Sequence, residues 1–321
     1  MYGFCVTGKG GILNKRMIFI GGLASASLFL HTTAPAADMA SLREQEYAGI
    51  RNAFCPKAEP APAPAAKTEP ADLYIEPARV FDNLYFVGDK STSSWALTTD
   101  KGIILIDAGF HYNVEGTIVG GMKKLGLDPA DIEYVIVSHG HNDHFGGARY
   151  LQATYGARIV LSEADWSHMV TWPQRGSPAP FPDRDISVKD GDVIALGKTS
   201  VRIVVTPGHT PGTISPIFKV KDGKQTHVVG YWGGDGAGYL PPKDIETYMR
   251  SADRFMGLDP AVDVELSNHV VADGTLLKLP LLKERRPGDP HPFVSGNAAF
   301  REWAGVLKSC AGAFLPRQRE P

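Results

Sequence analysis

The sequence has few cysteines, almost no net charge and no apolar run long enough to cross a membrane. Its 321 residues include three cysteines, and 33 basic against 35 acidic residues leave a formal net charge of −2. This charge gives no basic field for gathering phosphates, and no run of Lys and Arg interleaved with aromatic residues occurs along the chain. We therefore expect no nucleic-acid partner. With 43% hydrophobic and 21% charged residues, the composition is that of an ordinary soluble globular protein.

The N-terminal segment departs from this average. An apolar run extends from Met17 to Leu30 after several basic residues, and Ala34-Pro35-Ala36 follows at the spacing of a cleavage site. At fourteen residues the run is shorter than the roughly 20 needed to span a bilayer. We expect residues 1–37 to be a cleaved signal peptide, with Met1 or Met17 as the start, and the protein to be periplasmic or secreted. The alternative is an uncleaved anchor.

Export changes how the cysteines are interpreted. Cys5 would be removed with the signal peptide, so only Cys55 and Cys310 would remain in an oxidising compartment. They form either one disulfide or two free thiols, and the sequence leaves both open. Neither has the C-x-x-C spacing of a redox or metal site, so we assign them no catalytic role.

Residues 38–72 are expected to connect the signal peptide to the catalytic domain. Ser41 to Phe54 has the pattern of a short amphipathic helix. Pro56 to Asp72 is rich in Pro and Ala, which favours an extended tether. We expect the catalytic domain, residues 73–321, to begin near Leu73.

The catalytic domain begins with strands. Apolar segments with the alternation or continuity of half-buried and buried strands occur at residues 78–81, 84–87, 94–99, 103–106, 132–137, 158–161, 193–196, 201–205, 213–220, 226–231 and 262–266. Helical spacing occurs at residues 114–125, after Asp143, and at residues 242–256. Two strand-rich halves, each closed by helices, predict an α+β fold with four layers, an αβ/βα sandwich.

Three histidines and an aspartate lie within six residues, directly after the predicted strand at residues 132–137. They are His139, His141, Asp143 and His144. Imidazole nitrogen and carboxylate oxygen are ligands that zinc accepts, and a tight turn lets neighbouring side chains point toward two adjacent ions. This cluster is the densest indication of a metal site in the chain.

Three further candidate ligands, His209, Asp235 and His269, each directly follow a predicted strand. Loops at strand ends can bring residues that are distant in sequence to one edge of a sandwich. If these polar groups served only packing, each would need its own hydrogen-bond partner. The other histidines lack such a pattern, and we interpret them as structural or surface residues: His111, His168, His227 and His291.

The motif and the order of the later residues resemble the metallo-β-lactamase superfamily over about residues 78 to 310. The segments most similar to its third β-lactamase subclass are Leu84 to Gly88, Ile104 to Gly109, the run Gly208 to Gly212, and Leu266 to His269. The resemblance implies two zinc ions. The first would be bound by His139, His141 and His209, and the second by Asp143, His144 and His269.

Asp235 departs from that subclass, which has serine at the aligned position. Other β-lactamase subclasses have cysteine there, whereas glyoxalase-like and lactonase-like members have a metal-bridging aspartate. The resemblance therefore makes Asp235 a further candidate ligand and leaves the substrate open. Capping of the helix expected near Pro242 explains the residue less well, because Asp235 lies seven positions upstream.

Asp107 follows a predicted buried strand and precedes Ala108-Gly109. It either accepts a hydrogen bond from a metal ligand or a loop amide, and so orients the site, or forms a plain turn at a strand end. The sequence leaves both interpretations open.

The resemblance also implies a mechanism. Two zinc ions that share a water can lower its pKa and present hydroxide to an acyl carbon. Asp143 would orient that hydroxide and receive its proton. No Ser-x-x-Lys or Gly-x-Ser-x-Gly motif offers a competing nucleophile. Iron or manganese can also occupy carboxylate-containing sites, so the metal used in the cell stays open, as does the oligomeric state.

Three functions are consistent with these residues. The first is an exported β-lactamase-like hydrolase that opens a cyclic amide. The second, favoured by Asp235, is a metallohydrolase acting on a lactone, ester or thioester, and the third is a metal-binding module without turnover, which a complete ligand set disfavours. Aromatic residues in two loops, residues 162–186 and 236–242, either wall an apolar substrate pocket or merely anchor the loops: Trp166, Trp172, Phe181 and Tyr239.

Overall fold

The computed structural model describes residues 39–57, 70–173 and 178–316. The predicted signal peptide, with Cys5 and both possible start residues, and most of the predicted tether lie outside these ranges. No helix within them is long and apolar enough to cross a membrane.

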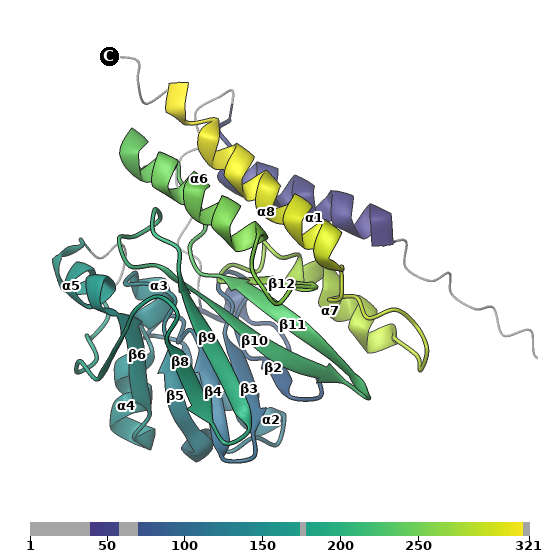
Figure 1. The fold of residues 1–321 in the computed structure, drawn as a ribbon. Helices are drawn as coiled ribbons and strands as arrows, with labels where there is room; N and C mark the ends of the chain where they lie inside the picture. Colours follow the sequence, from purple (N-terminus) through teal and green to yellow (C-terminus); the bar gives the residue numbers. More distant parts are fainter. Residues whose placement is uncertain (1–38, 58–69, 174–177, 317–321) are drawn as a thin grey trace, which may run out of the picture. The chain divides into compact units, whose positions relative to one another are not determined.

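Two β-sheets form the centre of the fold (Figure 1). The first has the order β1-β2-β3-β4-β5-β6-β7, antiparallel up to β4 and parallel from β4 onward. Its strands are β1 (Ala78–Phe81), β2 (Leu84–Phe86), β3 (Trp95–Thr99), β4 (Gly102–Ile106), β5 (Ile132–Ile136), β6 (Arg158–Ser162) and β7 (Ile186–Val188).

The second sheet has the order β12-β11-β10-β9-β8, with β12 parallel to β11 and the other neighbours antiparallel. Its strands are β8 (Val193–Leu196), β9 (Thr199–Val205), β10 (Ile214–Asp222), β11 (Gln225–Trp232) and β12 (Val264–Ser267). The α-helices are α1 (Met39–Phe54), α2 (Gly120–Lys124), α3 (Asn142–Phe145), α4 (Ala148–Tyr155), α5 (Glu163–Thr171), α6 (Pro242–Met256), α7 (Thr275–Glu284) and α8 (Asn297–Gly312). A π-helical turn, η2 (Glu115–Val119), leads into α2, and two short 3-10 turns are η1 (Pro70–Leu73) and η3 (Pro129–Asp131).

Three apolar clusters separate these elements into layers. One lies between the two sheets and joins residues such as Phe86 of the first sheet to Phe218 of the second. A second cluster joins the first sheet to α2, α4 and α5, and a third joins the second sheet to α1, α6 and α8. The order of layers is therefore helices, sheet, sheet, helices, which confirms the predicted αβ/βα sandwich.

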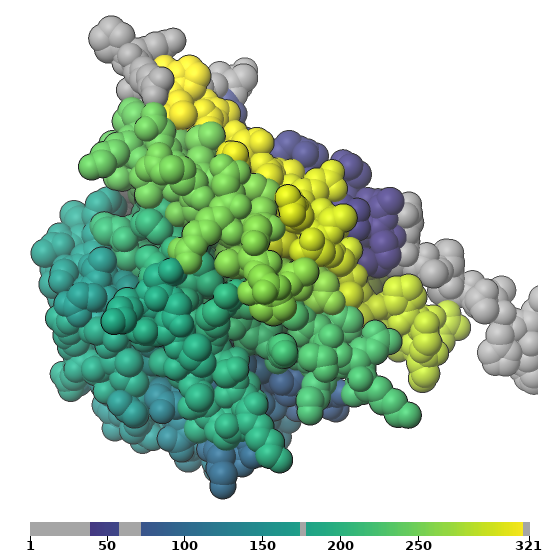
Figure 2. Space-filling view, viewed as in Figure 1, coloured from purple at the N-terminus to yellow at the C-terminus, as the bar shows by residue number. Residues whose placement is uncertain are grey.

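Helix α1, predicted from the sequence at Ser41 to Phe54, packs on this sandwich. It lies against α8 on the surface (Figure 1 and Figure 2), with Tyr47 and Ile50 buried. The residue after its end, Cys55, forms a disulfide with Cys310 of α8, so the structure contains the bridge that the sequence left open.

A buried ion network also ties α1 to the domain. Lys278 of α7 lies 3.2 Å from a carboxylate oxygen of Glu46 in α1 and 2.7 Å from one of Glu265 in β12. All three residues are at most 4% exposed. Removing one member of such a network leaves uncompensated buried charge, so these contacts fix α1 in place.

Strand direction brings the predicted site residues to one edge. Asp107 and the first histidine motif follow β4 and β5, which are parallel, so both leave the sheet at the same end. In the second sheet, β9 and β11 are both antiparallel to β10, and β12 is parallel to β11. The loops after β9, β11 and β12, which carry His209, Asp235 and His269, therefore share an edge as well.

Candidate metal centre

Nitrogen atoms of three histidines converge at this edge. His139 Nε2 lies 2.9 Å from His141 Nδ1 and 3.1 Å from His209 Nε2, and His209 Nε2 lies 3.2 Å from His141 Nδ1. His139 Nδ1 donates to the carbonyl oxygen of Gly233 at 2.8 Å, and His209 Nδ1 donates to that of Gly236 at 2.9 Å. Since a carbonyl oxygen only accepts, the Nε2 atoms of both rings present lone pairs to the group when the rings are neutral.

Burial keeps these imidazoles neutral. It lowers the pKa of His141 to about 2 and that of His209 to about 4, and it holds the pKa of His139 well below its usual value. His141 Nδ1 can donate to only one of the other two nitrogens. At least two of the three nitrogens therefore direct their lone pairs at each other with no proton between them. A cation satisfies all three, and nitrogen ligands of a tetrahedral zinc site lie about 3.3 Å apart. The donor set therefore fits a zinc ion.

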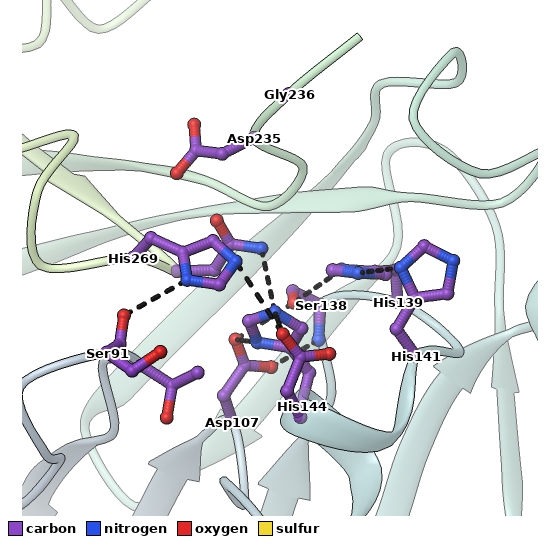
Figure 3. A network of polar contacts seen from close by, with 12 residues as sticks. Ser91, Asp107, Ser138, His139, His141, His144, Asp235, Gly236 and His269 are labelled. Atoms are coloured by element: carbon purple, nitrogen blue, oxygen red, sulfur yellow. Dashed lines mark hydrogen bonds and ion pairs between the residues drawn. The ribbon is translucent and has the colours of Figure 1, made fainter. Parts of the chain in front are cut away.

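A second group adjoins the first. His144 Nε2 lies 3.3 Å from Asp143 Oδ2, and His269 Nε2 lies 3.7 Å from the same oxygen. His269 Nδ1 donates to the carbonyl oxygen of Ser91 at 3.0 Å, which leaves Nε2 directed at the group (Figure 3). The rings of His139 and His144 are 4.3 Å apart, so the two groups are neighbours.

The electrostatics of the second group favour positive charge. Burial raises the pKa of Asp143, but the nearby histidines His144, His269 and His141 outweigh burial and hold this pKa below its usual range. Burial lowers the pKa of His144, but Asp143 and Asp107 outweigh burial and raise it to about 10. Two carboxylates beside one imidazole thus suit a cation, as a metal site requires.

Asp107 lies beneath the second group and is fully buried. Its carboxylate accepts hydrogen bonds from Ser138 N and Tyr231 Oη, both at 2.6 Å, and from His144 Nδ1 at 3.1 Å (Figure 3). Its φ of 59° lies in the left-handed region, which Asp tolerates better than most residues. The contacts correspond to the interpretation in which Asp107 orients a ligand, since its bond to Nδ1 directs Nε2 of His144 toward Asp143.

The carboxylate oxygens of Asp235 are not among the atoms that converge in the two groups. Its Oδ2 accepts a hydrogen bond from Ser267 Oγ at 2.5 Å, and the residue is 3% exposed. Burial, opposed by Ser267, raises its pKa to about 8. Figure 3 shows its carboxylate apart from the group around His144. The role of Asp235 as a metal ligand stays a prediction, and in this structure Ser267 holds its carboxylate.

A cavity of about 430 Å³ opens onto both groups. Of the predicted aromatic residues, Trp172 and Tyr239 line it, and the Tyr239 hydroxyl lies 3.1 Å from His209 Nδ1. Trp166 and Phe181 correspond to the other interpretation, that of loop anchors: Trp166 is buried and donates to the Ile186 carbonyl, and Phe181 stacks on Phe145. The described lining comprises Phe110, Gly140, His141, Asn142, Asp143, Trp172, Pro173, His209, Asp235, Tyr239 and His269.

Other residues near the site are not singled out by the sequence pattern. Phe110 lines the cavity, and His168 packs 4.9 Å from the Trp172 ring and 6.1 Å from that of His141. Asp165 is buried beside the first group. Its position shortly after the predicted strand at residues 158–161 could have indicated from sequence that it lies near the site. The predicted structural roles hold for His227, which pairs with Asp263, and for His291, which donates to the Val80 carbonyl.

Comparison with known proteins supports one family. A model described as the metallo-β-lactamase superfamily matches residues 87–223. A hydroxyacylglutathione hydrolase of Acidiphilium cryptum is 36% identical over 120 residues, which cover 33% of this chain and 44% of the relative. The hydroxyacylglutathione hydrolase GloC of Haemophilus influenzae is 30% identical over 159 residues, 47% of this chain and 72% of the relative. The chain spans a little under half the length of the first curated relatives it matches.

The solved structures match over more of the chain. BJP-1, a subclass B3 metallo-β-lactamase of Bradyrhizobium japonicum, is similar with a TM-score of 0.67 and 28% identity. The match covers 76% of this chain and 95% of that structure. Fold, ligand groups and relatives agree, and the chain belongs to the metallo-β-lactamase superfamily.

Proposed function

We propose that this chain is an exported, zinc-dependent hydrolase that opens the cyclic amide of β-lactams. The observation that carries the proposal is the pair of adjoining ligand groups, one neutral and one containing an ionised carboxylate, that open onto a single cavity. The similarity to a subclass B3 enzyme over most of the chain supports the lactam. Export rests on the signal-like N-terminal sequence.

The residues divide between two metal ions. The first group, His139, His141 and His209, would hold one zinc ion, and Asp143, His144 and His269 would hold a second. When bound, zinc supplies a water of lowered pKa and polarises an acyl oxygen.

The protein's own groups position the substrate and move the proton. Asp143 lines the cavity as an ionised carboxylate, so it can accept a proton from the attacking water. Tyr239 presents a hydroxyl beside His209 at the cavity wall, where it can donate to a substrate oxygen. Phe110 and Trp172 offer apolar surface to the groups attached to the scissile ring and exclude water around it.

Thioester or ester hydrolysis is the second candidate. It is supported by the curated relatives named hydroxyacylglutathione hydrolases and by an aspartate at position 235. The hydrogen bond from Ser267 to Asp235 Oδ2 supports the lactam instead, because it occupies one oxygen of this carboxylate. A metal-binding module without turnover fits less well, since the cavity gives access to the ligands of both groups.

The test compares substrates on one preparation. Steady-state kcat/KM is measured for the zinc-loaded protein with a chromogenic cephalosporin, a lactone and a glutathione thioester, each with and without a chelator. We expect chelator-sensitive turnover, with the cephalosporin preferred by at least about 100-fold, or about 2.7 kcal/mol in transition-state stabilisation. His227→Gln, at a histidine remote from the site, serves as the control. Preference for the thioester would make the likeness to β-lactamases one of scaffold alone.

A further inference from the structure

Asp165, in the first turn of α5, bridges the two loops that carry the first histidine group. Its Oδ2 accepts a hydrogen bond from the backbone N of Gly140, between His139 and His141, at 2.8 Å. The same oxygen accepts from Thr210 Oγ1 at 2.7 Å, and Oδ1 accepts from the backbone N of Gly212 at 2.7 Å. Thr210 directly follows His209. One carboxylate therefore holds both loops.

Both loops lie so close to α5 that neither Gly140 nor Gly212 has room for a side chain. A Cβ atom on Gly212 would lie 2.1 Å from Ser162 Oγ and 2.7 Å from Asp165 N. A Cβ atom on Gly140 would lie 3.1 Å from the backbone of Met169. The start of α5 thus acts as a common platform for the two loops, with Asp165 as its polar contact.

This carboxylate is costly for folding alone. Asp165 is fully buried, and no Lys or Arg forms a salt bridge with it in the part of the chain that the structure describes. Three hydrogen bonds satisfy its oxygens, but a buried carboxylate without a cationic partner is less stable than an apolar residue of similar size.

The first histidine group explains the buried charge. Its three ligands are neutral imidazoles, so they do not offset the charge of a divalent cation. The second group contains Asp143 and rests on Asp107. Asp165 supplies a buried carboxylate that accepts hydrogen bonds from both loops of the first group.

We propose that Asp165 is a positioning residue that couples the His139–His141 loop to the His209 loop and thereby sets the metal affinity of the first group. This inference rests on the proposed metal-binding role of the same three histidines. It adds a determinant that contacts neither metal nor substrate.

The variant Asp165→Asn tests the coupling at constant size. The amide nitrogen of Asn would face an N–H donor of Gly140 or Gly212, so one loop loses its bond and the charge is removed. In stepwise zinc titrations, with the first-group step identified by its loss in His209→Ala, we expect that step to weaken about 10- to 100-fold. The second-group step should change less than threefold.

Ser162→Ala is the matched control. Ser162 Oγ caps α5 by accepting from Asp165 N at 3.1 Å, so its removal perturbs the same turn without breaking a bond to either loop. We expect this variant to leave both zinc steps within threefold of wild type. Equal weakening of both steps in Asp165→Asn, or equal effects of the two variants, would mean that Asp165 only stabilises the fold and would overturn the proposal.

Amide hydrogen exchange of metal-free protein gives a readout independent of metal and turnover. We expect Asp165→Asn to speed exchange in peptides covering residues 138–147 and 206–213, with Ser162→Ala affecting α5 alone. Unchanged exchange in both loops would overturn the coupling even in an active enzyme. Failure of the proposed function is a separate result, namely wild-type protein that hydrolyses none of the three substrates while the loops still respond to the variant.

Discussion

The substitution Asp107→Asn isolates the charge beneath the second ligand group. Asn has nearly the same size, and it tolerates the φ of 59° at this position, so backbone strain is not introduced. The carboxylate accepts from Ser138 N, Ser138 Oγ, Tyr231 Oη and His144 Nδ1. The amide nitrogen of Asn cannot accept, so at least one buried donor loses its partner in either orientation of the amide.

The magnitude follows from that lost bond. Placing the nitrogen opposite Ser138 N breaks one hydrogen bond to a charged group and retains the others. Such bonds contribute about 1.5–3 kcal/mol. We therefore expect the free energy of unfolding of the metal-free variant to be about 2 kcal/mol lower than that of wild type. Because His144 is then held by a neutral group, zinc affinity of the second group should fall about 10- to 100-fold.

Two measurements test this prediction. Urea unfolding of chelated protein gives the stability difference, and competition with a chelating dye gives zinc affinity. Tyr231→Phe is the control, because it removes one donor and keeps the charge of Asp107. We expect this control to cost about 1 kcal/mol and to leave zinc affinity within threefold. Stability within 0.5 kcal/mol and zinc affinity within twofold of wild type for Asp107→Asn would refute the role assigned to this residue.

Four further predictions concern other parts of the chain. Lys278→Met should lower the free energy of unfolding by about 3–5 kcal/mol, measured in urea, because two buried glutamates lose their cation; a change below 1 kcal/mol would contradict this. Reduction of the Cys55–Cys310 disulfide should lower stability by about 2–4 kcal/mol, measured as a lower Tm with dithiothreitol. The Tm of a Cys310→Ser variant should be the same with and without dithiothreitol. In metal-free protein, His209 should destabilise the fold as pH falls from 6.5 toward 4, because the unfolded state protonates it at its ordinary pKa while the folded state holds that pKa near 4. His209→Gln should remove this contribution of about 3 kcal/mol, measured as the change with pH in the stability difference between variant and wild type, and a pH-independent difference would argue against it. Asp235→Ser should retain its zinc content, since Asp235 Oδ2 is bonded to Ser267 and the residue belongs to neither group of converging ligand atoms; loss of one equivalent would identify Asp235 as a ligand.

The convergence of the candidate ligands can be predicted from sequence because most of their loops directly follow strands. His139, His209 and His269 occupy loops whose strands have strong apolar patterns, and parallel strand ends meet at one edge. Strand assignment and motif spacing together therefore indicate a shared site. Helix α6 was predicted with its observed bounds, Pro242–Met256, because its apolar residues recur at helical spacing.

Other features depend on contacts that no local pattern contains. Helix α1 was predicted as a helix, but its docking was not, because it depends on α8 and Lys278, both more than 200 residues away in sequence. Helix α7 contains Pro280, which ordinarily ends a helix, and β7 has only three residues. These elements were absent from the prediction for that reason.

The orientation of polar side chains is equally out of reach of sequence. Asp235 occupies the place expected for a ligand, but the hydroxyl of Ser267, a neighbour only in the fold, takes up its carboxylate. Asp165 follows a predicted strand but has no motif of its own, and its bonds to both loops appear only when Gly140 and Gly212 are brought against α5.

The most direct test of the account is the zinc content of the purified protein, measured by mass spectrometry on the same samples used for cephalosporin hydrolysis. We predict about two zinc ions per chain, loss of turnover when a chelator removes them, and recovery in proportion to zinc restored. His209→Ala should retain about one ion and little activity. Full turnover by protein that holds no stoichiometric metal would contradict the central claim that the two ligand groups form the hydrolytic centre.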